Sequence, residues 1–432
     1  MPMNAQDLIE STSVISSIPG DTQAAEARLR RLAERHAQRV GPESPTAIVS
    51  APGRTELAGN HTDHNNGRVL CASVDLDVLA VVSPRSDSLV RIESEGYEEE
   101  IKVDVSSTAP RPEERERPHA LIRGVAAAFA EAGRAVTGFD ATVTSNVASG
   151  SGLSSSAAFE VLLGTTLVFL PGMGDAPGTQ ELSRDDVLFV ARAGRRAENE
   201  FFGKPCGLMD QIACAHGGII SIDFSLEPPE ITPVAFDFST AGYALAVVDT
   251  GGSHADLTAD YAAVPEEMRA VASELGGEVL ADCEEDSLYA RLAAIRRKCG
   301  DRAVLRALHF FSENRRVSLM IEALAEGNAE TYLRLVRESG ESSGMLLQNY
   351  YPPHAPEEQG IGIGTTMARH FLDVRDLQGA ARVHGGGFAG TIQVYIPIGQ
   401  WQNFVSAMEE IFGAGSVTRL RVRADAPRFI VP

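Results

Sequence analysis

Three segments of this 432-residue chain carry side chains suited to moving a charged group onto a hydroxyl. The first is a glycine- and serine-rich run at residues 150–158 (GSGLSSSAA), placed between an alternating polar–apolar stretch and a long apolar stretch. A glycine-rich turn that opens a helix lets backbone N–H groups approach an anion, and the helix dipole adds attraction. We interpret the run as a cradle for nucleotide phosphates. The residues assigned to it are Gly150, Ser151, Gly152, Leu153, Ser154, Ser155 and Ser156.

Other interpretations of this run have to be weighed. Taken alone, a Gly-Ser run is equally compatible with an ordinary turn. The sequence contains no Walker pattern (Gly-x-x-x-x-Gly-Lys-Ser/Thr), and the run lacks a third glycine at Rossmann spacing. A nucleotide site here is therefore of neither of those two kinds.

The second segment, residues 53–64 (GRTELAGNHTDH), concentrates one cation and several short hydrogen-bonding side chains in a predicted loop between strands. His61, Asp63 and His64 resemble part of a metallohydrolase motif, but no second His or Cys cluster stands at a usable spacing. A polyhydroxylated ligand suits the set better, because a carboxylate can accept hydrogen bonds from two adjacent hydroxyls.

The third segment, residues 198–211 (ENEFFGKPCGLMDQ), presents two carboxylates on neighbouring predicted elements. Glu198 stands near the end of a helix, and Asp210 follows after a tight turn. One carboxylate could hold magnesium on a nucleotide while the other faces the attacking hydroxyl. Two surface acids of an acidic protein are the alternative. A further glycine-rich loop at residues 384–390 (HGGGFAG) permits close backbone approach to a ligand, or is a flexible turn.

The elements that must position these residues are predicted from periodicity and turn signals. Alternation over residues 139–147 predicts a strand with one buried face, and residues 153–170 predict a buried helix. A second helix begins near Ser183, with Asp186 in capping-box spacing, and continues to Phe202. Further helices are predicted at 22–40, 209–215 and through most of 255–347; further strands at 47–50 (before a turn at 51–53), 69–82, 218–224, 243–249 and 391–398, with a hairpin or edge at 93–105. The irregular mixing of strands and helices predicts an α+β fold.

Composition narrows the class of protein. With 38 Lys and Arg against 59 Asp and Glu, the net charge of −21 argues against nucleic-acid and anionic-membrane partners. No stretch has the length of a membrane span, and the first twenty residues lack the pattern of a signal peptide. Five scattered cysteines fit a reducing compartment. We expect a cytoplasmic protein with small-molecule partners and no obligate protein partner.

The segments, in this order, resemble the signatures of the kinases that act on galactose, homoserine, mevalonate and phosphomevalonate. Within that superfamily the chain is similar to the galactokinase family, over roughly residues 45–425. Residues 54–67 resemble the galactokinase signature, and residues 206–211 (CGLMDQ) resemble the catalytic segment of that family. Residues 250–261 (TGGSHADLTADY) are similar to its region that ends in a sugar-contacting tyrosine.

The resemblance implies an ATP-dependent sugar kinase that phosphorylates the anomeric hydroxyl of galactose, giving galactose 1-phosphate and ADP. Asp210 would face that hydroxyl as the base, and Arg54 beside it would stabilise the transferring phosphoryl group. Magnesium would lie on Ser156 and Glu198. The residues implied in sugar binding are Asn60, His61, Thr62, Asp63, Gly207 and Tyr261.

Some positions depart from the family pattern. Asn60 stands where the family usually has a Glu that accepts a hydrogen bond from the sugar hydroxyl at carbon six. Glu56 replaces a common Asn, His64 replaces a common Tyr, and Gly386 and Ala389 alter the last glycine loop. A 1-kinase for a related sugar (galacturonate, arabinose or an amino sugar) is therefore an alternative. A sensor that binds sugar and ATP without turnover is another, although the serine cradle that such relatives are expected to lose in part is complete here.

The same resemblance implies the architecture. Residues 1–237 would form a domain like ribosomal protein S5 domain 2, preceded by a helical extension at 1–44. Residues 238–432 would form a ferredoxin-like domain, and the active site would occupy the cleft between the two. The Pro-rich stretch at residues 228–233 suggests the boundary.

Overall fold

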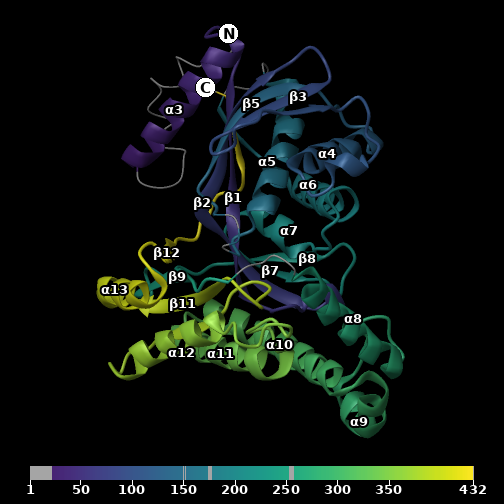
Figure 1. Cartoon of the computed structure of the whole chain (residues 1–432), viewed down its shortest axis with the longest axis vertical. Coiled ribbons are helices and arrows are strands. Elements are labelled where there is room, and N and C mark those ends of the chain that lie inside the picture. Colours follow the sequence, from purple (N-terminus) through teal and green to yellow (C-terminus); the bar gives the residue numbers. More distant parts are fainter. Residues whose placement is uncertain (1–21, 149, 151, 174–177, 253–256, 432) are drawn as a thin grey trace.

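The structure is a computed structural model that describes residues 22–148, 150, 152–173, 178–252 and 257–431. It is a mixed α+β fold built on two sheets (Figure 1). The strands are β1 (Ala47–Ala58), β2 (Arg68–Pro84), β3 (Leu89–Ser94), β4 (Ile101–Asp104), β5 (Phe139–Ser145), β6 (Gly178–Glu181), β7 (Ile219–Asp223), β8 (Glu230–Val234), β9 (Tyr243–Asp249), β10 (Ala380–Val383), β11 (Thr391–Pro397), β12 (Val417–Leu420) and β13 (Arg428–Val431). The helices are α3 (Thr22–Val40), α4 (Pro118–Glu131), α5 (Ser155–Phe169), α6 (Arg184–Arg196), α7 (Met209–His216), α8 (Thr258–Leu275), α9 (Glu285–Cys299), α10 (Asp301–Ala325), α11 (Ala329–Ser342), α12 (Gly360–Asp373) and α13 (Trp401–Phe412).

The first sheet has nine strands and is covered on both faces. Its main path runs β4-β3-β5-β2-β1-β13-β6, while β7 pairs with β2 and β8 with β7. Helices α4 to α7 cover one face, and α3 covers the other (Figure 1). Along β1 the side chains alternate between these layers: Val49 joins the core under the four helices, and Ile48 packs against Leu29 and Leu32 of α3.

The prediction of one buried face for the strand at residues 139–147 was wrong. In β5 every residue from Phe139 to Thr144 is buried. The polar face lies under α3, where Thr142 bonds His36 and Arg39. Polar alternation is normally read as solvent exposure, but here the polar side chains pair with a helix that lies over them.

The strand predicted at residues 47–50 is also longer than expected. β1 continues through the Pro-Gly pair to Ala58, so Arg54 and Glu56 stand on a strand rather than in a loop. The pairing with β2 shifts register between Pro52 and Arg54, which accommodates the turn signal as a bulge inside the strand. Helix α4 has no counterpart among the predicted elements.

The second sheet has four strands in the order β10-β11-β9-β12. Its side chains Val248, Ile392 and Val394 pack against Phe371 of α12 and Phe404 of α13. The other face joins the main core, so hydrophobic packing is continuous between the two sheets. Helices α8 to α11 occupy most of the stretch predicted as helical, and together with α12 they lie below the second sheet in Figure 1.

The chain returns to the first sheet at its last strand. β13 pairs with β1 on one side and with β6 on the other. β9, which opens the second sheet, begins shortly after the boundary proposed between residues 237 and 238. That boundary stays a prediction, and residues 428–431 complete the first sheet rather than the second.

One described helix, α5 with its extension to Gly172, is long and apolar enough to cross a membrane. Of this stretch, Ser155–Gly172, 61% is buried inside the fold. Figure 1 shows α5 against the first sheet among α4, α6 and α7. The expectation that no stretch has the length of a membrane span was therefore wrong, and the length and apolar character of α5 are explained by its place in the core.

Candidate active site

The predicted phosphate cradle lies at the start of α5 and against the bulge of β1. Ser154 precedes the helix with φ of +59°, and its hydroxyl donates to Asp210 instead of capping the helix. The backbone N–H of Arg54 donates to the carbonyl of Leu153 at 3.1 Å. A Cβ on Gly53 would lie 2.8 Å from that same carbonyl oxygen, so a glycine is needed where strand and cradle meet. A helix start without a side-chain cap favours an anion.

Arg54 and Asp210 form a two-point ion pair beside this cradle. Arg54 Nε donates to Asp210 Oδ1 at 2.8 Å, and Nη2 donates to Oδ2 at 2.6 Å. Arg54 Nη1 also donates to the carbonyl of Gly152. Arg54 is 5% exposed, whereas the Asp210 side chain is 30% exposed. The buried Arg54 guanidinium is therefore held in place by hydrogen bonds inside the protein, whereas the Asp210 carboxylate stays accessible to a ligand.

The pair determines the charge state of the carboxylate. Burial alone would raise the pKa of Asp210, but the charge and hydrogen bonds of Arg54, with a hydrogen bond from Ser154, lower it below its ordinary value. The pKa of Arg54 is raised by the same partner against the effect of burial. Asp210 is thus an ionised acceptor at neutral pH, and the guanidinium keeps its positive charge.

Glu198 lies on the six-residue π-helical turn that continues α6 (Ala197–Phe202) and is 3% exposed. Its Oε1 accepts from Ser156 Oγ and from Lys204 Nζ, both at 3.1 Å. Its Oε2 accepts from Gln211 Nε2 at 3.1 Å, and the same Gln211 nitrogen donates to Glu160 Oε2 at 3.0 Å. Burial and the charge of Glu198 raise the pKa of Glu160 well above its ordinary value.

The oxygens of Ser156 and Glu198 suit a magnesium ion that is shared with a nucleotide. Mg²⁺ prefers oxygen ligands and is commonly held by one or two protein groups together with substrate phosphates and water. Among the described residues, no group of three or more His, Cys, Asp or Glu side chains is arranged to hold a metal alone. A site completed by phosphate fits this pair.

The predicted sugar loop follows β1 and faces the turn before α7. A Cβ on Gly207 would lie 1.9 Å from Asp63 Oδ2, so the Asp63 carboxylate lies directly against the Gly207 backbone. His61 has φ of +60°, and its Nε2 lies 2.8 Å from the carbonyl of Gly386. Burial lowers the pKa of His61 to about 3, so the ring is neutral and Nε2 carries the proton. The other ring nitrogen, Nδ1, is then a hydrogen-bond acceptor.

Tyr261, near the start of α8, closes this group from the second half of the chain. Its hydroxyl donates to the carbonyl of Gly387 at 3.0 Å, and its ring packs edge-to-face on Phe388 with centroids 5.4 Å apart. A Cβ on Gly386 would lie 2.5 Å from the Tyr261 ring. The glycine loop at 384–390 is thus held between Tyr261 and the sugar loop.

Two predicted sugar-binding side chains already form hydrogen bonds within the protein. Asn60 is fully buried: its Nδ2 donates to the carbonyl of Gly385 at 2.6 Å, and its Oδ1 accepts from Asn349 Nδ2 at 2.8 Å. Thr62 is also fully buried, and its Oγ1 lies 2.6 Å from the carbonyl of Arg68. Both side chains therefore shape the loop from behind.

The structure brings the predicted catalytic, phosphate and metal residues together at the start of α5, in two hydrogen-bonded sets around Asp210 and Glu198. The predicted sugar residues gather in a further group around the glycine loop at 384–390. Ser151 lies outside the described residues. Several side chains on which these groups depend were not predicted from the sequence. They are Lys204 and Gln211 at Glu198, Glu160 behind Gln211, and Asn349 at Asn60. Lys204 could have been identified from the sequence, because it is the one cation between Glu198 and Asp210.

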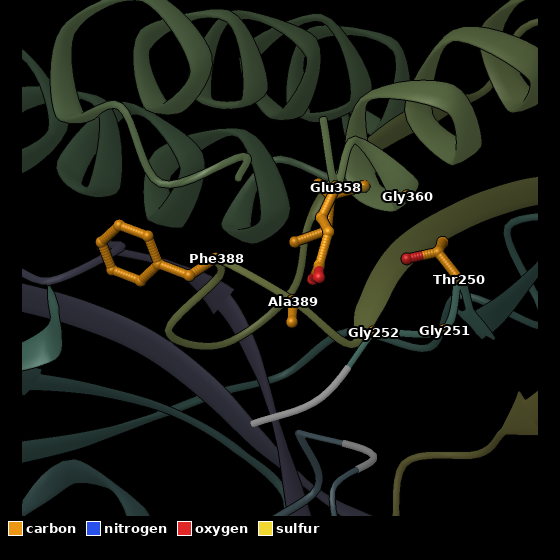
Figure 2. A pocket seen from close by; sticks show the side chains of 8 residues that line it. Thr250, Gly251, Gly252, Glu358, Gly360, Phe388 and Ala389 are labelled. Carbon is orange, nitrogen blue, oxygen red and sulfur yellow. The ribbon is translucent and has the colours of Figure 1, made fainter. Parts of the chain in front are cut away.

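A cavity of about 310 Å³ lies beside the glycine loop (Figure 2). Phe388 and Ala389 line it from that loop, and Thr250 and Glu358 line it from the end of β9 and the approach to α12. Among the described residues, none of those predicted to bind phosphate, metal or sugar or to act in catalysis lines this cavity. It shares Phe388 with the packing of Tyr261, so the two sites are neighbours.

Comparisons with known proteins agree with this geometry. The model of the galactokinase galactose-binding signature matches residues 34–84, and the model of the N-terminal domain of the GHMP kinases matches residues 120–218. A galactokinase of Streptomyces coelicolor is 31% identical over 409 residues, covering 93% of this chain and 97% of that protein. A human galactokinase is 30% identical over 396 residues, covering 89% and 93% respectively.

A solved structure has the same fold. It is the galactokinase of Lactococcus lactis in complex with galactose, with a TM-score of 0.77 and 22% identity, covering 93% of this chain and 99% of that one. Two matched family models, relatives of about 30% identity along almost their whole length and a shared two-sheet fold lead to one assignment. The chain belongs to the galactokinase family.

Proposed function

We propose that this protein is a galactokinase, a sugar kinase that transfers the γ-phosphoryl group of ATP to the anomeric hydroxyl of galactose. The products are galactose 1-phosphate and ADP. The family assignment supports the kinase chemistry and ATP as substrate. The observation that carries the proposal is the two-point ion pair between Arg54 and Asp210, held against the cradle by Ser154.

The ion pair has the properties that phosphoryl transfer requires. This reaction depends mainly on positioning and on neutralising charge, because the protein has little covalent chemistry to perform. We assign to Arg54 the stabilisation of the transferring group, since burial and pairing hold its charge in place. Asp210 would accept a hydrogen bond from the attacking hydroxyl in place of the one from Ser154. Its lowered pKa favours orientation of that hydroxyl first, with the proton accepted late in the transfer.

The sugar would be bound by the second group of residues. Asp63 can accept from two adjacent hydroxyls, and neutral His61 offers an acceptor at Nδ1. Tyr261 and the Gly207 backbone complete the proposed contacts. Asn60 and Thr62 are assigned a supporting role, because their polar atoms are already bonded to the protein.

Ser156 and Glu198 are the proposed magnesium ligands. The ion would neutralise charge on the nucleotide phosphates, which is the chemistry it supplies in kinases. Lys204 shares Oε1 of Glu198 and is 59% exposed, so its ammonium group has room to turn toward a phosphate.

All five cysteines are free, in keeping with a reducing cytoplasmic compartment.

A coupled ADP-release assay over a panel of sugars tests the proposal. The panel contains galactose, galacturonate, arabinose and galactosamine, each at equal concentration with ATP and Mg²⁺. We expect galactose to give the highest kcat/KM. Turnover with another sugar alone would make the chain a 1-kinase of that sugar, and binding of sugar and ATP without ADP release would make it a sensor.

A further inference from the structure

Behind the proposed magnesium ligand lies a second carboxyl group that the mechanism does not use. Glu160 stands one turn into α5 and is fully buried. Its Oε2 accepts from Gln211, and its Oε1 has no hydrogen-bond partner among the described residues. A buried polar atom without a partner destabilises the folded state. Glu160 is therefore a poor choice for stability at this position.

Three helices leave space for this carboxyl group. A Cβ on Gly194 of α6 would lie 2.9 Å from Glu160 Oε2 and 3.2 Å from Gln211 Cγ. A larger residue at position 194 would displace the Glu160 carboxyl group from where it lies. The position of Glu160 between α5, α6 and α7 is thus built into the packing.

Gln211 connects the two carboxyl groups through one nitrogen. Nε2 has two hydrogens, and the acceptors are Glu198 Oε2 at 3.1 Å and Glu160 Oε2 at 3.0 Å. An amide turned by 180° would direct its oxygen at Oε2 of Glu198 and lose the bond to that oxygen. Glu160 therefore defines which end of the Gln211 amide faces Glu198.

We propose that Glu160 is a positioning residue for metal binding: it holds the Gln211 amide so that its N–H group orients the Glu198 carboxylate. This rests on the proposed role of Glu198 as a magnesium ligand. With Oε2 bonded to Gln211, Oε1 of Glu198 is the oxygen left toward Ser156. Partners that orient a metal ligand typically change metal affinity by 10- to 100-fold when they are removed.

The test compares two variants at one position. Glu160→Met keeps the volume and removes the acceptor, whereas Glu160→Gln keeps an acceptor oxygen for Gln211. Binding of Mn²⁺ in the presence of a non-hydrolysable ATP analogue is measured by electron paramagnetic resonance, and Tm is measured without ligand. We expect Glu160→Met to weaken Mn²⁺ binding about tenfold while its Tm equals or exceeds that of the parent. Glu160→Gln should stay within about twofold in Mn²⁺ affinity.

The outcomes separate positioning from a structural role. Normal Mn²⁺ binding in Glu160→Met, or equal weakening in both variants, would overturn the proposal. If Glu160→Met does not fold, Gln211→Met takes its place and should weaken Mn²⁺ binding to the same degree. Glu198→Gln is the control for the site itself: unchanged Mn²⁺ binding there would remove Glu198 as a ligand and the proposal with it.

Discussion

At the scale of single residues, the site solves the problem of keeping an arginine in the protein interior. An unpaired buried cation is very costly, so Arg54 needs a counter-charge. Asp210 supplies it and is itself the proposed catalytic carboxylate. The two roles are inseparable, because the interaction that lowers the pKa of Asp210 also holds Arg54 beside the cradle.

Asp210→Asn should abolish most turnover while leaving nucleotide binding largely intact. The amide keeps the shape, but it cannot accept the proton and no longer neutralises Arg54. We expect kcat to fall by roughly 10²- to 10⁴-fold, measured by ADP release, with the nucleotide Kd from calorimetry within a few-fold of the parent. Asp223→Asn is the matched control, since Asp223 pairs with Arg68 on the surface. Near-normal turnover of Asp210→Asn would remove Asp210 from the reaction.

Tyr261→Phe should act mainly on sugar binding. The change removes the hydrogen bond to Gly387 and with it the support of the glycine loop. One lost hydrogen bond costs roughly 1 kcal/mol, which corresponds to about a fivefold increase in KM for galactose. Steady-state kinetics provide the measurement, and Tyr289→Phe, at an exposed tyrosine, provides the control. An unchanged KM would mean that Tyr261 has no part in the sugar pocket.

At the scale of elements, α3 is attached to the first sheet by polar contacts as well as apolar ones. Arg28 donates to Asp77 at 2.5 Å, and the His36 ring lies between Thr142 at 3.0 Å and Ser83 at 2.9 Å. Burial lowers the pKa of His36 to about 3. This helix therefore contributes a pH-sensitive contact to the fold.

The stability of the protein should fall as pH drops below about 6.5, partly because of His36. Below that pH the unfolded chain binds a proton at His36 that the folded chain does not, so stability rises with pH across this range. The stabilisation that comes from neutral His36 is fully present above pH 6.5. About 2 kcal/mol of it is lost at pH 5, and the loss grows toward pH 3. Urea unfolding at pH 7.5 and pH 5 should show a smaller difference for His36→Gln than for the parent. Equal differences would contradict the assignment.

The sequence predicted elements well where one periodic pattern determines them. α3 and β9 have the predicted bounds, because α3 carries its apolar residues at a helical repeat and β9 is a short unbroken apolar run. β1 and β5 were predicted less well for physical reasons. The Pro-Gly pair in β1 forms a bulge and does not end the strand. The polar face of β5 is covered by α3, a helix that is far from β5 in the sequence. Neither circumstance is visible in local sequence.

The candidate site was predicted through the resemblance rather than through periodicity. Arg54, Ser154 and Asp210 are far apart in the chain, and the structure places them in direct contact. Their roles stay predictions. Glu160 and Gln211 could not have been found from the sequence, since a Glu inside an apolar helix gives no indication of its partner.

At the scale of the whole molecule, the two sheets share one core. Tyr332 of α11 and Tyr395 of β11 are joined hydroxyl to hydroxyl at 2.7 Å, and both pack against Phe238 at the junction. β13 strengthens the connection by crossing back to pair with β1. The sugar and phosphate groups of the site are therefore held on one continuous framework.

Ending the chain before residue 428 should prevent stable folding. The deletion removes the buried side chains of Phe429, Ile430 and Val431, and it leaves β1 unpaired on the side away from β2. At about 1.5–3 kcal/mol for each side chain, the loss approaches the whole stability of a typical protein. Soluble yield and Tm are the measurements, and Arg428→Gln, which keeps the strand, is the control. A truncated protein with the parent Tm would show that β13 is dispensable.

The position of β13 also has a consequence for how this protein is made. Residues 428–431 leave the ribosome after every strand of the second sheet, yet they occupy the gap between β1 and β6. During synthesis the first sheet therefore stays incomplete between β1 and β6 until residues 428–431 have been made. A first half expressed alone would lack this closure.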